Sequence, residues 1–311
     1  MLALTSTINS ARIASDRKQF YKEDNMKTIT FINCKGGVGK SSTVQAVSYL
    51  LTLRKKRVLV VDIDPQANTT LALSDIDLMD LLKKRTGMAG DLQNPVTVED
   101  LLVDRDMDPR DAIRSTAYEG LDIIRALPTL AAVEESLKAD VRTPQQFRLR
   151  NQLAKVANDY DYVLIDCGPS LSILNINALV ASEEVFIPTQ VDSGSLWGVS
   201  MTIEELIRPV RSYAPKLMLG GIFITRCKDR TISAQEGFRV LAELWPDKFL
   251  PFTINENAAV TNASQKKVPL PVYDRNSRAQ ATKDYKLLAG YIDAADRVAY
   301  LRDLMDAGKE S

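Results

Sequence analysis

The sequence predicts an α/β fold, with a single doubly wound, mostly parallel sheet and helices on both of its faces. Three neighbouring segments support the prediction. Residues 28–34 (TITFINC) are rich in β-forming side chains and run directly into glycines. Ser41 to Leu53 then carries apolar side chains at helical spacing, and residues 57–62 (RVLVVD) form a continuous apolar strand. Strand, tight loop, helix and second strand make a βαβ unit, and such an apolar strand is typical of a parallel sheet buried on both faces.

The rest of the chain repeats this alternation of strands and helices. Further strands are expected at Leu121–Arg125, Tyr162–Ile165, Glu184–Pro188, Leu217–Ile224 and Phe249–Ile254. Helices are expected between them, at Gln145–Asn158, Leu196–Val210 and Ser233–Leu244. Residues 74–119 are less regular, and we expect short helices and loops beside the sheet. Residues 1–25 are expected to form a flexible N-terminal extension, so that the folded domain spans residues 26–311.

The composition excludes several classes of protein. The 311 residues include three cysteines and no histidine. Histidine-dependent hydrolases and histidine-ligated metal enzymes are therefore excluded, and the scattered cysteines are too few for a disulfide framework. No apolar run approaches ~18 residues, and the first 25 residues lack the apolar core of a signal peptide. We therefore expect a cytoplasmic protein that does not enter a membrane.

Charge is balanced over the whole chain but not along it. Forty Lys and Arg residues offset forty Asp and Glu residues. Residues 208–286 hold 14 Lys and Arg against 7 Asp and Glu, a local net charge of +7, whereas residues 287–311 hold 3 against 5. A basic segment in a neutral protein is typical of a local polyanion site, although a solvated surface can have the same composition.

A phosphate-binding loop connects the first strand to the first helix. Residues 35–42 (KGGVGKSS) approach the pattern GxxxxGK[ST], with Cys34 in place of the first glycine. Glycines let successive backbone N–H groups point at phosphate oxygens, and the start of the helix adds the positive end of its dipole. We expect Lys40 to reach the β- and γ-phosphates and the Ser41 hydroxyl to ligate Mg²⁺. The expected nucleotide contacts in this loop are Lys35, Gly36, Gly37, Val38, Gly39, Lys40, Ser41 and Ser42.

The additional lysine at the start of this loop indicates which family it resembles. KGGVGKSS resembles the deviant Walker A motif of the ParA/MinD family of ATPases, in which the first lysine reaches the nucleotide of a partner subunit. The resemblance implies that Lys35 contacts phosphate in the partner subunit, while Lys40 contacts phosphate in its own. It also implies an ATP hydrolase that uses ATP and Mg²⁺, with ATP holding two subunits together.

Two aspartate motifs continue the resemblance. Residues 61–68 (VDIDPQAN) are similar to the family's VDxDPQxN, which implies that Asp64 helps to position the attacking water and that Asp62 supports the Mg²⁺ shell and the loop. Residues 162–166 (YVLID) resemble a Walker B strand, whose final aspartate holds Mg²⁺ through water. The family has D-x-P-P at this point, and Gly168 replaces the first proline. The implied catalytic residues are Lys35, Lys40 and Asp64, and the implied metal ligands are Ser41, Asp62 and Asp166.

The resemblance covers nearly all of the chain after residue 26. Residues 222–226 (IFITR) resemble the next strand and its exit, which implies a nucleotide contact at Arg226. Residues 253–257 (TINEN) fall where the family has T-I-P-x-N, the segment that lines the adenine. Ile254, Asn255 and Asn257 are therefore implied as contacts, with Asn255 in place of the proline. Residues 26–311 are identified as a ParA-like ATPase domain.

Two further features favour the small ParA, or Soj-like, partitioning ATPases within this family. Only about 25 residues precede the first strand, too few for the operator-binding domain of larger ParA proteins. Residues 294–306 have an apolar face but no basic face, unlike the membrane-binding helix of MinD relatives, and we expect them to pack on their own domain. That apolar face consists of Ala294, Val298, Leu301 and Met305.

The resemblance to small ParA proteins implies a DNA-partitioning ATPase. Its ATP-bound homodimer binds DNA without sequence preference, associates with the nucleoid, and is released when a ParB-type centromere-binding protein stimulates hydrolysis, which moves a plasmid or chromosome. The expected DNA contacts are Arg275, Arg278, Lys283 and Lys286, in and just after a stretch similar to the family's YDPxSxGAxAY. Three alternatives stay open: an ATPase that positions a protein cargo, a MinD-like regulator at a membrane surface, and a metabolic P-loop enzyme related to amide ligases.

Overall fold

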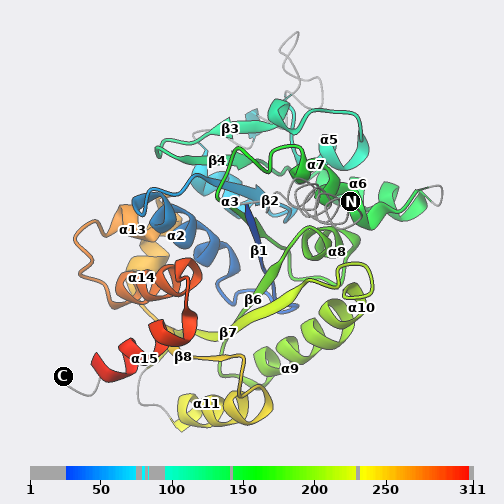
Figure 1. Ribbon diagram of the computed structural model, residues 1–311. Coiled ribbons are helices and arrows are strands. Elements are labelled where there is room, and N and C mark those ends of the chain that lie inside the picture. The colour runs from blue at the N-terminus through cyan, green and yellow to red at the C-terminus, as the bar shows by residue number, and fades with distance from the viewer. Residues whose placement is uncertain are drawn as a thin grey trace, which may run out of the picture.

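The computed structural model describes residues 26–74, 79–80, 83, 95–140, 143–228 and 232–307 (Figure 1). Eight strands form one sheet in the order β3-β4-β2-β5-β1-β6-β7-β8. They are β1 Lys27–Phe31, β2 Val58–Asp62, β3 Ile113–Ser115, β4 Leu121–Ile124, β5 Tyr162–Asp166, β6 Glu184–Thr189, β7 Met218–Cys227 and β8 Phe249–Asn255. All neighbours are parallel except β3 and β4. The predicted fold class is confirmed, and the N-terminal extension predicted at residues 1–25 lies outside the described residues.

Helices cover both faces of the sheet. One group packs into a core with α8 at its centre: α5 Val98–Val103, α6 Leu130–Ala139, α7 Arg148–Ala154, α8 Ile173–Val180, α9 Ser193–Met201, α10 Arg208–Val210 and α11 Ile232–Leu244. The other group covers the opposite face: α2 Lys40–Leu53, α3 Asn68–Leu73, α12 Ala258–Gln265, α13 Leu270–Tyr273, α14 Gln280–Asp293 and α15 Arg297–Ala307. In the described part of the chain, no helix is both long and apolar enough to cross a bilayer.

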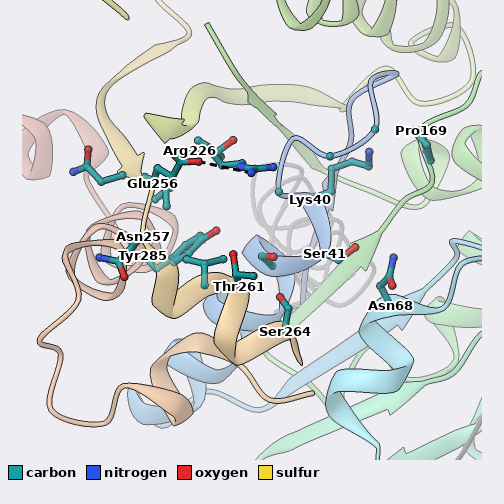
Figure 2. Close-up of a pocket in the computed structure, with 18 of the residues that line it drawn as sticks. Lys40, Ser41, Asn68, Pro169, Arg226, Glu256, Asn257, Thr261, Ser264 and Tyr285 are labelled. Atoms are coloured by element: carbon teal, nitrogen blue, oxygen red, sulfur yellow. Dashed lines mark ion pairs between the residues drawn. The ribbon is translucent and has the colours of Figure 1, made fainter. Parts of the chain in front are cut away.

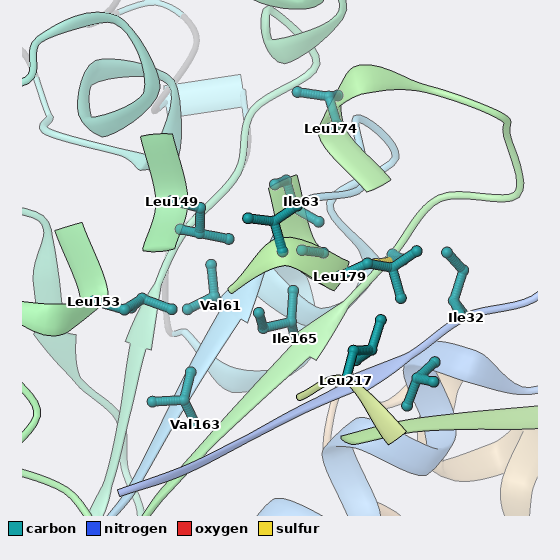
Figure 3. Close-up of a cluster of buried hydrophobic side chains, with 14 of the residues drawn as sticks. Ile32, Val61, Ile63, Leu149, Leu153, Val163, Ile165, Leu174, Leu179 and Leu217 are labelled. Atoms are coloured by element: carbon teal, nitrogen blue, oxygen red, sulfur yellow. The ribbon is translucent and has the colours of Figure 1, made fainter. Parts of the chain in front are cut away.

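The alternation of side chains along each strand produces two separate cores. Val58 and Val60 of β2 point into the core that contains α2 and α14, whereas Leu59 and Val61 point into the core that contains α7 and α8. Figure 3 shows the second core, where Val61 lies among side chains from β5, α7 and α8. Because both faces are covered, every residue of β2 is buried, which explains the uninterrupted apolar run in the sequence.

The strand order creates the position of a ligand site. From β1 the chain first builds β2, β4 and β5 on one side and then β6, β7 and β8 on the other, so the order of strands reverses at β1. Ligands of open α/β sheets bind outside the carboxyl ends of the strands at such a switch point. The cavity drawn in Figure 2 lies there, between the loop that follows β1 and the end of β8.

Two elements differ from the sequence prediction because tertiary contacts determine them. The edge strand β3 was not predicted, since Arg114 and Ser115 are exposed and the segment has no apolar run; it forms by antiparallel pairing with β4. The helix predicted over Leu196–Val210 begins at Ser193 and contains a π-helical segment, Thr202–Ile207. The Thr202 hydroxyl donates to the carbonyl of Gly198 at 2.7 Å and accepts the backbone N–H of Cys34 at 3.0 Å.

The last helix packs on its own domain as predicted, but only part of the predicted face takes part, because Leu301 packs against the core that contains α2 and α14. Val298 is 68% exposed and Met305 is 57% exposed, so two members of the predicted face point to solvent. The guanidinium of Arg297 instead forms bonds of 3.0 and 2.8 Å to the carboxylate of Glu184 on β6. The Tyr300 hydroxyl donates to the carbonyl of Leu287 on α14 at 3.0 Å. The Arg297 ion pair fixes the rotation of α15 and overrides its weak apolar pattern.

Candidate nucleotide-binding site

A cavity of about 510 Å³ opens at the carboxyl edge of the sheet (Figure 2). Eleven predicted site residues line it: the nucleotide contacts Gly36, Gly37, Gly39, Lys40, Ser41, Ser42, Arg226, Ile254, Asn255 and Asn257, and the catalytic residue Asp64. Four predicted residues do not: Lys35, Val38, Asp62 and Asp166. The lining also includes residues for which no role was predicted: Gln66, Asn68, Pro169, Thr225, Glu256, Val260, Thr261, Ser264 and Tyr285. The cavity therefore runs from the loop after β1 to the β8–α12 junction.

The conformation of the phosphate-binding loop depends on its glycines and on a hydrogen bond from β7. Gly37 and Gly39 have φ angles of 75° and 81°, in the left-handed region where other residues are strained. Gly39 precedes Lys40, the first residue of α2, so the N-terminus of that helix points at the cavity. The Val38 side chain is buried and its carbonyl accepts the Thr225 hydroxyl at 2.9 Å. Val38 thus anchors the loop, while its glycine neighbours line the cavity.

Lys40 lines the cavity beside the glycines of the phosphate-binding loop. Its Nζ donates to the carbonyls of Asn33 at 3.2 Å and Lys35 at 3.1 Å, both in the preceding loop. Burial lowers the pKa of the Lys40 ammonium, and the nearby carboxylates, chiefly that of Asp166, oppose the shift. A buried ammonium that is held only by carbonyl oxygens is placed to bind a polyanion.

Lys35 lies outside this cavity. Its ammonium forms an ion pair with Asp192, which caps the N-terminus of α9 by accepting the backbone N–H and the hydroxyl of Ser195. Burial opposes ionisation of Asp192, but the bonds from Lys35 and Ser195 lower the pKa of this carboxyl to about 2. A Cβ on Gly198 would lie 2.6 Å from Asn33 Oδ1, so this glycine allows α9 to approach the loop.

Asp62 and Asp166 lie side by side at the ends of β2 and β5, where they are register partners. Asp62 accepts the backbone N–H of Asp64 at 3.1 Å and the N–H and hydroxyl of Thr70 at 2.7 and 2.8 Å. Burial raises the pKa of Asp62 well above its usual range, and the charge of Asp166 adds to the shift. Asp62 therefore holds the loop that follows β2, and its place in the Mg²⁺ shell stays a prediction.

Asp166 has the features expected of a metal-binding carboxylate. Its Oδ2 accepts the Thr69 hydroxyl at 2.7 Å, while its Oδ1 is buried without a hydrogen-bond partner among the described residues. Burial raises the pKa of Asp166 to about 6, against the effect of the Thr69 bond. In the described part of the chain, no group of three or more His, Cys, Asp and Glu side chains could hold a metal alone. The Ser41 hydroxyl lies close enough to Asp166 to lower the pKa of this carboxyl, and one carboxylate beside one hydroxyl fits Mg²⁺ that is shared with phosphate oxygens.

Asp64 is the carboxylate that faces the cavity near the phosphate end. It is 6% exposed, and its Oδ1 accepts the backbone N–H of Gln66 at 2.9 Å. A Cβ on Gly168 would lie 3.3 Å from this oxygen, so the glycine leaves room for the Asp64 side chain. A carboxylate in this position can orient a water molecule for attack on a terminal phosphate.

The far end of the cavity is assembled from three separate segments. Ile254 and Asn255 end β8, Asn257 caps α12 by accepting the N–H of Ala259 at 2.9 Å, and Tyr285 comes from α14. Arg226, the exposed next-to-last residue of β7, has a φ of 48° and approaches Glu256 to 3.7 Å (Figure 2). Tyr285 comes soon after the YDPxSxGAxAY-like stretch, but nothing in its local pattern connects it to a loop more than two hundred residues earlier.

The four predicted DNA contacts lie away from this cavity. Arg275 and Arg278 are exposed in the loop before α14, and Lys283 and Lys286 are exposed on its first two turns. Asp274 fixes that loop, because its carboxylate accepts the N–H groups of Arg278 at 3.0 Å and Ala279 at 2.8 Å and the Thr282 hydroxyl at 2.7 Å. The structure thus leaves all four cations accessible, and a DNA contact at any of them stays a prediction.

Comparison with known proteins identifies the family. A family model described as an AAA domain matches residues 26–218. The sporulation initiation inhibitor protein Soj of Bacillus subtilis is 34% identical over 273 residues, which cover 88% of this chain and 98% of Soj. The chromosome partitioning protein ParA of Caulobacter vibrioides is 31% identical over 251 residues, 80% of this chain and 88% of that protein. The chain belongs to the Soj/ParA family of partitioning ATPases.

Solved structures of related fold contain the predicted cofactors. Cobyrinic acid a,c-diamide synthase of Mycobacterium smegmatis, with a bound ATP analogue and magnesium, has a TM-score of 0.70 and 27% identity over 88% of this chain and 98% of that one. An ATP complex of a McdA variant from Cyanothece has a TM-score of 0.74 over 88% of this chain and 98% of that one; at 20% identity it supports the fold alone. This member of the Soj/ParA family is an ATPase, and ATP with Mg²⁺ is the cofactor set of related proteins.

Proposed function

We propose that this chain is a DNA-partitioning ATPase whose ATP-bound homodimer binds DNA without sequence preference. The placement of Lys35 is the observation on which the proposal rests. Lys40, Ser41 and Asp64 line the chain's own cavity, whereas Lys35 lies outside it on an ion pair with Asp192. A lysine in the loop that serves no group of its own cavity is available to a second subunit. Charge that is supplied across an interface stabilises a transferring phosphoryl group.

In the proposed mechanism the chain's residues bind the phosphates, orient the attacking water and stabilise charge on the transferring phosphoryl group. The loop N–H groups and Lys40 hold the β- and γ-phosphates, and Asp64 orients water for attack on the γ-phosphorus, which yields ADP and phosphate. Ser41 and Asp166 would hold Mg²⁺, which neutralises charge on the phosphates, and Asp62 would support its shell. Lys35 would leave Asp192 and reach the partner subunit's nucleotide. Hydrolysis, stimulated by a ParB-type partner, would remove the contact and separate the dimer.

DNA binding in this proposal uses the four exposed cations of residues 275–286. Lys and Arg contacts to phosphate give affinity that ignores sequence and weakens steeply with salt. Binding along chromosomal DNA would make the dimer nucleoid-associated, and repeated cycles would move a plasmid or chromosome. Two carboxylates, Asp274 and Asp284, lie in the same segment, so residues 274–286 carry a formal net charge of +2.

The test is binding to a random-sequence DNA duplex by fluorescence anisotropy, with ATP, ADP or no nucleotide, at several salt concentrations. The wild-type chain should bind tightly only with ATP. Lys35→Ala should lose ATP-dependent dimerisation and DNA binding, and the double variant R275A/R278A should dimerise but bind DNA at least about tenfold more weakly. Arg302→Ala, an exposed arginine on α15, is the matched control. Dimerisation without DNA binding would exclude the DNA proposal and favour a protein cargo.

A further inference from the structure

A groove of about 450 Å³ lies at the amino edge of the sheet, opposite the nucleotide-binding site. Met26, which precedes β1, and Leu217, which precedes β7, line it together with the last turn of α7 and the end of α8. The groove and the nucleotide cavity share no lining residue. Its volume is within the range of pockets that hold small ligands. We call it the amino-edge groove.

The floor of the amino-edge groove is apolar. Leu153, Val180 and Leu217 line it and are 2%, 3% and 2% exposed. The hydroxyl of Ser182, beside them, is already bonded, because it donates to the carbonyl of Ala178 at 2.8 Å. A ligand that covers this floor therefore needs an apolar body, which gains free energy by leaving water.

Two cationic side chains from separate elements line the same groove. Arg150 belongs to α7 and Lys216 to the loop before β7, and both are exposed. Neither forms an ion pair within the part of the chain that the structure describes. Glu183 is the one carboxylate among the lining residues, and it accepts the backbone N–H of Thr28 at 3.2 Å. The lining thus has two cations against one carboxylate, which favours an anionic ligand.

The guanidinium of Arg150 is held beside the groove by stacking. It lies 4.5 Å from the centroid of the Phe147 ring. The Phe147 ring in turn packs edge-on against Tyr213, with centroids 6.1 Å apart, and Tyr213 also lines the groove. A guanidinium that stacks on a ring keeps the N–H groups in its plane free for a carboxylate. Arg150 is therefore pre-organised to bind an anion at this place.

We propose that the amino-edge groove binds an aliphatic carboxylate, a medium-chain fatty acid, with its acyl chain on the apolar floor and its carboxylate paired with Arg150 and Lys216. The apolar floor favours an acyl chain over a sugar or nucleoside. The two cations favour a carboxylate over an uncharged head group, and arginine binds carboxylates through two parallel hydrogen bonds. The inference is independent of the proposed function, which uses the opposite edge of the sheet.

The test titrates the full-length chain with decanoate and with decanol, which has the same number of carbon atoms and no charge, by isothermal titration calorimetry. The wild-type chain should bind decanoate about five- to tenfold more tightly, because two exposed ion pairs contribute a few-fold each. Each methylene removed, down to hexanoate, should weaken binding about two- to fourfold. The double variant R150Q/K216Q should bind decanoate and decanol equally. K248Q/R302Q removes the same charge at exposed positions outside the groove and should keep the preference.

A second variant tests the floor without changing the charge. Ala154→Trp, at an exposed position of α7 that lines the groove, should fill it and abolish decanoate binding, whereas Ala132→Trp, exposed on α6, should not. ATP affinity should be unchanged in all four variants, which checks that they are folded. Equal affinity of the wild-type chain for decanoate and decanol, or decanoate binding that survives Ala154→Trp, would overturn the inference. Binding to phosphatidylglycerol vesicles without binding to monomeric decanoate would also overturn it and would favour a membrane surface.

Discussion

The two ends of the cavity are constructed by different means. At the phosphate end, consecutive residues 36–42 supply the loop, and sheet register places Asp62 beside Asp166. At the base end, β8, α12 and α14 each contribute a few side chains, and bonds such as that from Asn255 to Asp284 hold them together. Backbone and register therefore determine the first end, whereas tertiary hydrogen bonds determine the second. We therefore expect substitutions to have larger effects at the phosphate end than at the base end.

The largest effect is expected for Asp166→Asn at the phosphate end. Loss of the metal-binding charge should reduce ATP hydrolysis by at least about a hundredfold, because a bound cation contributes several kcal/mol to the transition state. The same substitution should stabilise the nucleotide-free protein at pH 7. Burial raises the pKa of Asp166 to about 6, so the ionised carboxylate costs up to about 3 kcal/mol in the folded state.

The raised pKa of Asp166 makes the free energy of unfolding depend on pH. Between about pH 4 and 6 the folded state binds more protons at Asp166 than the unfolded state does, so this contribution to stability falls as the pH rises. Urea unfolding in EDTA should therefore show a gain for Asp166→Asn at pH 7 that disappears near pH 4. Asp303→Asn, exposed on α15, should show no such dependence. A variant that is less stable than wild type at pH 7 would contradict the prediction.

A matched pair of threonine substitutions compares the two ends directly. The Thr70 hydroxyl is buried, donates to Asp62 at 2.8 Å and accepts the N–H of Ala126 at 3.0 Å. Thr70→Val leaves both partners without this bond and should lower the free energy of unfolding by about 2 kcal/mol. Thr261→Val makes the same change at the base end, where Thr261 is exposed. It should change the free energy of unfolding by less than about 0.5 kcal/mol. Equal shifts in urea denaturation would remove the distinction between the two ends.

The residues of the phosphate end could be predicted from the sequence because their positions depend on local motifs. Asp62 and Asp166 each end an apolar strand, and parallel strands place such residues at one edge, so the pattern predicts both at the carboxyl edge of the sheet. The pairing of β2 with β5 in the structure makes them neighbours. Lys35 was distinguished by its spacing from the glycines. Its pairing with Asp192 could not be predicted, because that contact depends on how closely α9 approaches the loop at Gly198.

The base end and the last helix required tertiary information. Tyr285 reaches the cavity, and Asp284 reaches the N–H of Asn255, only because α14 packs against α2 and β8, which no short window of sequence encodes. The predicted face of the last helix was only partly right for a related reason: Leu301 packs against the core, but the rotation set by the ion pair from Arg297 to Glu184 leaves Val298 and Met305 exposed. Edge strand β3 also depends on tertiary contacts. Its segment has no apolar run, and the strand forms through antiparallel pairing with β4.

The smallest predicted effect concerns the glycine beside Asp64, where the phosphate end departs from its family. A Cβ at position 168 would lie 3.3 Å from Asp64 Oδ1, closer than an ordinary contact, and that oxygen already accepts the Gln66 N–H at 2.9 Å. Gly168→Ala should therefore displace the carboxylate by a few tenths of an ångström and slow hydrolysis about two- to fivefold, since orientation of water depends on its position. ATP affinity should be unchanged, because Asp64 is not expected to bind the phosphates. Single-turnover hydrolysis and equilibrium binding, measured together, separate the two quantities. A rate equal to that of wild type would mean that the Asp64 carboxylate adapts to its neighbour, and the phosphate end would then be less rigid than its register implies.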